Sequence, residues 1–422
     1  MGVKIAVVGG GSTYTPELVE GFARRTSRLP IDELVLLDTD SERLDIVGGL
    51  AGRMLQRLDW HGRLVLTGDR DAAIDGADFV LIQLRVGGQA ARLVDETLPP
   101  TFGVVGQETT GAGGFAKALR TVPVVLELGE ITSRRGAPGA WIVDFTNPVG
   151  IVTQALVDAG HRAIGLCNVA INIQRTVAEH LGVTSDRVEL EHVGLNHLSW
   201  ERAVRVDGHD RLPELITTEA DWLATQMGLP VDLIRTLGSI PSYYLRYYYE
   251  TARVVADQRD GHTRAQDVID IEARLLDLYR DETLTEKPEL LARRGGAFYS
   301  EAAAQLIASL HDGAGDIQVV DTRNDGALPD LAATAVVEIP ARIDRDGAHP
   351  LPLAPLGAEI RGLVQQVKAY EELAIETAMS GDRGSALRAL MANPLVGDWA
   401  IAEPLLEALL EANRAYLPRF FR

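Results

Sequence analysis

Residues 3–14 read VKIAVVGGGSTY, and this stretch decides the fold class of the N-terminal part of the chain. Val3 to Gly9 form a short apolar run closed by glycines, which is typical of a buried strand in a parallel sheet. A second apolar run, Glu33 to Leu37, ends at Asp38, and a helical pattern begins near Ser41. A strand, a helix and a second strand make a βαβ unit, so an α/β fold with a parallel sheet is predicted.

The rest of the chain divides at about Glu189. Before it, strands alternate with helical patterns, and further strands are expected at residues 79–84, 140–145 and 163–166. Strand patterns at residues 188–200 and 202–206 then give way to long helical stretches. We expect helices over residues 265–281, 287–310, 356–379 and 399–416, and strands at residues 318–320 and 335–339.

Length and charge limit the possible functions. A chain of 422 residues is longer than a single hydrophobic core usually organises, so two packed domains are expected. The 60 acidic and 41 basic side chains give a net charge of -19, which argues against a long nucleic-acid interface. Small-molecule or protein partners are favoured, and a few local arginines can still bind an anion.

Apolar runs and cysteine content bear on the compartment. No run of eighteen or more apolar residues and no signal-peptide pattern is present, so a cytoplasmic protein without a membrane partner is expected. The single cysteine, Cys167, cannot form an internal disulfide, which agrees with a reducing compartment.

The glycine-rich turn after the first strand is a candidate dinucleotide site. Gly9 and Gly11 occupy the first two positions of the G-x-G-x-x-G fingerprint, and Tyr14 stands at the third. The first two glycines allow close approach of a pyrophosphate, whereas the third mainly serves helix packing, so binding remains feasible. Asp38 is placed to accept hydrogen bonds from the adenosine ribose, which favours NAD. The residues assigned to the cofactor are Gly9, Gly11, Ser12, Thr13, Asp38 and Arg43.

These features predict a Rossmann-type, doubly wound parallel sheet with a second, mixed α+β and helix-rich domain. We place the NAD-binding domain at residues 1–190 and a substrate-binding and oligomerisation domain at residues 191–422. A homodimer or homotetramer is expected.

Several further motifs follow one another along the chain. They read GGGSTYTPE at 9–17, GQETTG at 106–111, FTNP at 145–148, CNV at 167–169, GLNH at 194–197 and PSYYLRYYY at 241–249. In this combination the chain resembles glycoside hydrolase family 4 over nearly its whole length. The resemblance implies a fold similar to lactate and malate dehydrogenases, in agreement with the βαβ pattern.

The resemblance also implies a metal site. It assigns the metal ligands to Cys167 and His197, thirty positions apart. A thiolate and an imidazole by themselves suggest zinc, but family members are typically Mn²⁺-dependent, with substrate hydroxyls completing an open shell. Without the resemblance, Cys167 would be interpreted as a small buried apolar residue.

One tyrosine in the PSYYLRYYY segment is implied to be the catalytic base. The alignment with the family points to Tyr244, while most of its tyrosine neighbours are expected to be structural. The implied mechanism uses NAD⁺ to oxidise carbon 3 of a sugar, after which Tyr244 removes the proton from carbon 2. The metal stabilises the enediolate; elimination, water addition and return of the hydride complete a hydrolysis without net redox change. This scheme replaces the carboxylate pair of most glycosidases.

Substrate contacts follow from the same comparison of motifs. They are implied for Arg92, Asn147, Asn168 and Arg264, and Glu108 is a candidate for orienting a metal-bound water. Arginine suits the phosphate of a 6-phospho-sugar because its planar fork binds two oxygens. Asn168 after the cysteine is typical of 6-phospho-β-glucosidases, whereas Ala170 replaces the usual proline. The predicted substrate is therefore a phosphorylated disaccharide or aryl glycoside.

Three alternatives stay open at this point. One is another family 4 specificity, for an α-linkage or an unphosphorylated sugar. The second is a true NAD-dependent dehydrogenase of the lactate or malate type, which would not need Cys167, His197 or the tyrosines. The third is a nucleotide-binding regulatory protein without turnover.

Overall fold

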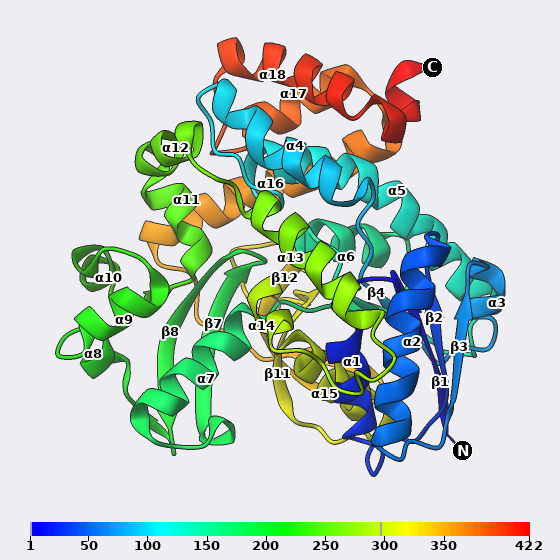
Figure 1. Ribbon diagram of the computed structural model, residues 1–422. Helices are drawn as coiled ribbons and strands as arrows, with labels where there is room; N and C mark the ends of the chain where they lie inside the picture. Colours follow the sequence, from blue (N-terminus) through cyan, green and yellow to red (C-terminus); the bar gives the residue numbers. More distant parts are fainter. Residues whose placement is uncertain (1, 296–297) are drawn as a thin grey trace.

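The computed structural model describes residues 2–295 and 298–422, within which nine strands form one large sheet (Figure 1). Its strand order is β13-β12-β11-β6-β5-β4-β1-β2-β3. The parallel part contains β1 (Val3–Val8), β2 (Ile31–Leu37), β3 (Arg63–Thr67), β4 (Phe79–Ile82), β5 (Trp141–Asp144) and β6 (Ala163–Gly165). The order 3-2-1-4-5-6 is that of a Rossmann sheet, so the predicted fold class is confirmed.

Burial on both faces explains why β1 is continuously apolar. Ile5 and Val7 pack on one side against Phe22 and its neighbours, while Ala6 and Val8 pack on the other against Leu128 and its neighbours. The helices of this half are α1 (Thr15–Ala23), α2 (Ser41–Arg57), α3 (Arg70–Ile74), α4 (Gly88–Thr101), α5 (Gly111–Arg135), α6 (Val149–Asp158) and α7 (Val169–Leu181). The predicted helix start near Ser41 is confirmed; Asp40 caps that helix by accepting a hydrogen bond from the Arg43 amide at 3.0 Å.

The C-terminal half adds to the same sheet and builds a second one. Antiparallel strands β11 (Ile317–Arg323), β12 (Val336–Asp344) and β13 (Gly347–Pro350) extend the large sheet beyond β6. The second sheet contains β7 (Val188–Leu195), β8 (Leu198–Val206), β9 (His209–Asp210) and β10 (Ile240–Pro241). Because strands from both halves share one sheet, the halves are packed together, and the boundary near residue 190 stays a prediction.

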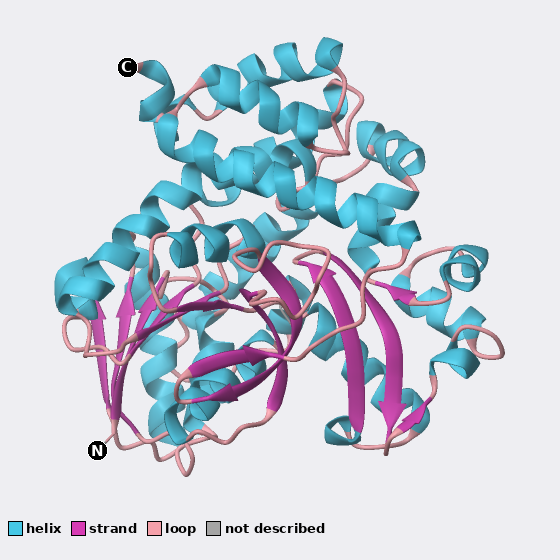
Figure 2. Ribbon diagram, turned by 180° about the vertical axis from the view of Figure 1, so that it is seen from behind, coloured by secondary structure: helices cyan, strands magenta, loops and turns pink. Residues whose placement is uncertain are grey.

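Helices complete the C-terminal half. They are α8 (Leu212–Leu215), α9 (Ala220–Met227), α10 (Val231–Leu237), α11 (Arg246–Tyr249), α12 (Thr251–Asp260), α13 (Arg264–Tyr279), α14 (Leu290–Arg294), α15 (Tyr299–Asp312), α16 (Ala358–Ser380), α17 (Arg383–Ala392) and α18 (Trp399–Ala412). Figure 2 shows the strands gathered in the lower half of the molecule and helices above them. In the described part of the chain, no helix has the length and apolarity that a membrane crossing requires.

Two expected elements differ from the structure. The single helix predicted over residues 287–310 is wrong, because α14 ends at Arg294 and α15 begins at Tyr299. Gly295 has φ +93°, a conformation that would interrupt an α-helix, and residues 296 and 297 lie outside the described residues. The strand pattern at residues 188–200 is also divided: β7 and β8 are joined by a tight turn in which His197 has φ +62°.

Candidate active site

A cleft of about 1530 Å³ opens at the carboxyl ends of the parallel strands, where doubly wound folds bind their ligands. The segments that directly follow β1, β2, β4 and β5 line this cleft. The predicted site residues that line the cleft are Gly9, Gly11, Ser12, Asp38, Arg43, Arg92, Glu108, Asn147, Asn168, Tyr244 and Arg264. Thr13, Cys167 and His197 are buried and do not line it.

The glycine turn has no room for larger residues. Gly9 has φ +88°, and a Cβ atom on Gly10 would lie 2.7 Å from the Leu36 Cβ. The Gly11 amide donates to Asp38 Oδ2 at 2.8 Å, and the Asp40 amide donates to Asp38 Oδ1 at 3.1 Å. These bonds hold the Asp38 carboxylate at the end of β2 and at the rim of the cleft, which is the position that ribose recognition requires.

Tyr14 replaces the third glycine without closing the turn. Its side chain is buried, and its hydroxyl accepts a hydrogen bond from the Ser300 amide at 3.0 Å. Its ring packs edge-on against Tyr299 with 6.4 Å between the ring centroids. The tyrosine therefore fastens the start of α1 to the start of α15, where a glycine would have let the helix approach the sheet more closely.

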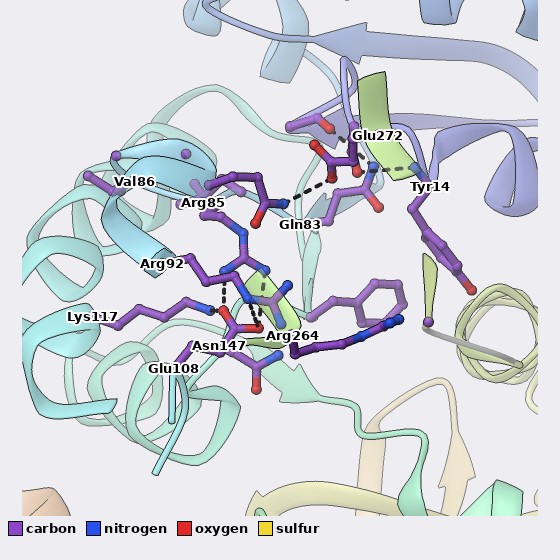
Figure 3. A pocket seen from close by; sticks show the side chains of 18 of the residues that line it. Tyr14, Gln83, Arg85, Val86, Arg92, Glu108, Lys117, Asn147, Arg264 and Glu272 are labelled. Carbon is purple, nitrogen blue, oxygen red and sulfur yellow. Dashed lines mark hydrogen bonds and ion pairs between the residues drawn. The ribbon is translucent and has the colours of Figure 1, made fainter. Parts of the chain in front are cut away.

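A cluster of cations surrounds Glu108 on one wall of the cleft (Figure 3). Lys117 Nζ lies 2.7 Å from Glu108 Oε2, Arg92 Nε lies 3.3 Å from Glu108 Oε1, and Arg85 pairs with the same carboxylate. Burial alone would raise the pKa of Glu108, but the three cations hold it well below its usual value. Burial, with Arg85 nearby, lowers the pKa of Lys117 to about 7. In this structure Glu108 is therefore an ionised carboxylate that holds the three cationic side chains together.

The two predicted substrate arginines differ in their surroundings. Arg92 is buried and also pairs with Glu96, with 2.7 Å between Nε and Oε1. Arg264 begins α13, is 47% exposed, and donates to the carbonyl oxygen of Arg293 at 2.7 Å. Arg92 therefore belongs to the interior wall and Arg264 to the rim.

Cys167 and His197 lie behind the tyrosines that line the cleft. The Tyr299 hydroxyl is 4.0 Å from Cys167 Sγ, and the ring of Tyr244 stacks on His197 with centroids 3.7 Å apart. Burial lowers the pKa of His197 to about 4, so its imidazole is neutral, as a metal ligand must be. Burial raises the pKa of the Cys167 thiol, and the buried carboxylates of Glu338 and Asp321 reinforce this.

These residues fit a divalent metal that shares its shell with a substrate. Among the described residues, no group of three or more His, Cys, Asp or Glu side chains is placed to hold a metal, and the pair assigned from the motifs is Cys167 and His197. Asn147 Oδ1, on the cleft side, is buried and has no hydrogen-bond partner in the described part of the chain. A polar oxygen of this kind is expected to meet a bound group.

Tyr244 stands in a 3-10 turn, Tyr243–Leu245, directly after β10. Its ring lies between His197 and Tyr243, whose centroid is 4.7 Å away. Burial raises the pKa of the Tyr244 phenol, and the neighbouring Tyr243 and Cys167 raise it further. A cation at the adjacent metal site would have the opposite effect, because it favours the phenolate.

The motifs did not indicate a second charged cluster beside the nucleotide turn. Glu272 of α13 binds Arg43 at 3.2 Å and Arg294 at 3.1 Å, and Arg294 Nε also donates to Thr13 Oγ1 at 3.1 Å. Thr13 consequently faces Arg294 rather than the cleft. These contacts join positions far apart in the chain, and local spacing carries no signal for them.

Comparison with known families matches both halves of the chain. A family model described as "Family 4 glycosyl hydrolase" matches residues 4–183, and one described as "Family 4 glycosyl hydrolase C-terminal domain" matches residues 192–396. A probable 6-phospho-β-glucosidase of Bacillus subtilis is 42% identical over 436 residues, which cover 100% of this chain and 98% of the relative.

Solved structures of related enzymes resemble this chain along nearly its whole length. The 6-phospho-β-glucosidase of Thermotoga maritima, in a form with manganese, NAD⁺ and glucose-6-phosphate, matches with TM-score 0.93 and 36% identity. The match covers 98% of this chain and 99% of that one. A malate dehydrogenase of Plasmodium falciparum matches with TM-score 0.53 and 14% identity over 89% of this chain and 98% of its own, which shows a shared fold alone.

Proposed function

The chain belongs to family 4 of the glycosyl hydrolases, and we propose on this premise that it hydrolyses 6-phospho-β-glucosides with NAD⁺ and a divalent metal, Mn²⁺ above all. The motif-based family assignment is thereby confirmed. The observation that carries the proposal is the cleft, where the nucleotide turn and Tyr244 meet, with Cys167 and His197 directly behind. The Thermotoga maritima relative solved with manganese, NAD⁺ and glucose-6-phosphate supports the proposal.

The nucleotide is proposed to bind along the carboxyl edge of β1 and β2. The glycine turn that leads into α1 lines the cleft and suits a pyrophosphate, because a helix N-terminus attracts anions. Gly9 and Gly11 let the phosphates approach the backbone, and Asp38 accepts hydrogen bonds from the ribose. Arg43 adds a positive charge, which Glu272 now partly neutralises.

Tyr244 is proposed to take the proton from carbon 2 of the sugar. NAD⁺ at the glycine turn would supply the hydride acceptor and donor for carbon 3, and a divalent metal held by Cys167 and His197 would supply a Lewis acid for the sugar oxygens. Tyr244 accepts the carbon 2 proton at its hydroxyl, and its stacking on His197 fixes the ring for that transfer.

The phosphate and the sugar are assigned to the polar wall of the cleft. Arg264 at the rim is exposed enough to meet the phosphate, while Arg92 contributes charge from the interior. Asn147 and Asn168 both line the cleft and are proposed to bind sugar hydroxyls. Glu108 holds the nearby cations and is proposed to act behind the site, without touching the sugar. A homodimer or homotetramer stays a prediction.

A panel of chromogenic glucosides tests the substrate class. With NAD⁺, Mn²⁺ and a thiol reductant, rapid release of nitrophenol is expected from the 6-phospho-β-glucoside, because its phosphate pairs with arginine. The 6-phospho-α-glucoside and both unphosphorylated glucosides are the matched controls and should react far more slowly. A preference for an unphosphorylated or α-linked substrate, measured as kcat/KM, would contradict the assignment.

A further inference from the structure

The hydroxyl of Thr109 contacts the His197 ring at Nδ1. Thr109 belongs to the loop between α4 and α5, and its Oγ1 is 2.8 Å from His197 Nδ1. The same hydroxyl oxygen lies 2.8 Å from Gln107 Oε1, to which it donates. The three side chains therefore form a short chain of hydrogen bonds from the loop to the imidazole.

The direction of these bonds follows from counting protons. A threonine hydroxyl carries one proton, and the carbonyl oxygen of a glutamine side chain can only accept. Gln107 Oε1 also accepts from the Thr109 amide, which fixes the orientation of the glutamine amide. If the hydroxyl proton is directed to Gln107, Thr109 Oγ1 offers only lone pairs to His197, and both 2.8 Å contacts are hydrogen bonds only when Nδ1 donates to Oγ1.

That direction decides which ring nitrogen is free. A neutral imidazole carries one proton, and an Nδ1 that donates to Thr109 holds that proton. The lone pair of His197 is therefore at Nε2. A metal binds a ring nitrogen through its lone pair. A residue that accepts a hydrogen bond from the other ring nitrogen orients the histidine and fixes its tautomer.

We propose that Gln107 and Thr109 are positioning residues that hold His197 in the Nδ1-protonated tautomer and so prepare Nε2 for the metal. This inference rests on the proposed function, because it concerns the same metal site. Thr109 does not line the cleft, so its proposed role is exerted through His197. The tight turn at His197, with φ +62°, keeps the ring against this chain of hydrogen bonds.

The neighbouring threonine provides a matched control. Thr110 stands at the N-terminus of α5 and is buried, whereas Thr109 is half-buried, and the Thr110 Oγ1 has no hydrogen-bond partner among the described residues. Thr110→Val makes the same exchange of a hydroxyl for a methyl group as Thr109→Val does, at the adjacent position, and does not affect the contact with His197. Thr109→Ser keeps the hydroxyl and removes only a methyl group.

Mn²⁺ binding to the full-length protein with NAD⁺ present tests the inference, with free Mn²⁺ measured by electron paramagnetic resonance. Thr109→Val should weaken Mn²⁺ binding about 10–100-fold, the range for loss of an outer partner of a metal-binding histidine. Thr109→Ser and Thr110→Val should bind Mn²⁺ like the unmodified protein, and NAD⁺ affinity should not change in any variant. Equal Mn²⁺ affinity in Thr109→Val and the unmodified protein would overturn the inference.

A second measurement tests the inference on the unmodified protein and so does not depend on the folding of a Thr109 variant. Nitrogen-15 spectra of the metal-free, unmodified protein report the tautomer of each histidine, with the His197 signal identified by its loss in His197→Gln. The proton is expected on Nδ1, and a proton on Nε2 would overturn the inference while leaving the proposed function intact. Failure of the unmodified protein to bind Mn²⁺ at all would instead remove the proposed function and the inference with it.

Discussion

Tyr244→Phe is expected to lower kcat by about 10²–10⁴-fold, the usual contribution of a general base. The variant loses only the hydroxyl, so the ring still stacks on His197 at the observed 3.7 Å separation and the cleft keeps its shape. NAD⁺ and Mn²⁺ affinity should therefore be unchanged. Exchange of the carbon 2 proton with deuterated solvent should fall together with kcat, because both require the same proton transfer.

Tyr243→Phe is the matched control for this substitution. The two rings are 4.7 Å apart, and burial raises the pKa of both phenols, so pKa does not distinguish them. Contact with His197 distinguishes the two tyrosines, because Tyr244 stacks on the imidazole. If carbon 2 exchange survives in Tyr244→Phe and disappears in Tyr243→Phe, the base is Tyr243.

The second large effect is expected at Cys167. Cys167→Ser replaces a thiol that can ionise beside a cation by a hydroxyl that does not, in a buried site with few other donors. Mn²⁺ affinity should fall by more than the roughly 10–100-fold loss associated with outer partners of a metal. Activity should fall in parallel and recover partly at high Mn²⁺ concentration.

Serine is close in size to cysteine, so Cys167→Ser should preserve the packing between β6 and α7. Thermal unfolding of the metal-free protein serves as the control and should change little. Unchanged Mn²⁺ affinity in a folded Cys167→Ser variant would reject the cysteine as a ligand and leave only His197.

Local patterns in the chain predicted most of the fold. Apolar runs closed by glycine or an acid located β1 and β2, because strands buried on both faces must be continuously apolar. The helix predicted through Gly295 was wrong, since periodicity continued across a glycine that adopts φ +93°. The pattern at residues 188–200 likewise gave no sign of the turn at His197, because a two-residue turn hardly interrupts an apolar run.

The site was predictable where its residues fall in motifs after strands. Asp38, Asn147 and Asn168 follow β2, β5 and β6, and the carboxyl ends of parallel strands share one edge of a sheet. The partners of these residues were not predictable. Arg294 contacts Thr13 across 281 positions, and the three cations around Glu108 come from the loop after β4, from α4 and from α5. Such contacts depend on tertiary packing alone.

The ratio of NADH formed to glucose 6-phosphate released tests the central claim most directly. The unmodified protein is supplied with NAD⁺, Mn²⁺ and a 6-phospho-β-glucoside, and both products are followed together. Because the hydride returns to the sugar in each cycle, we predict many molecules of product for each enzyme and NADH that never exceeds the number of active sites. One NADH for every product molecule would contradict the account and identify a dehydrogenase.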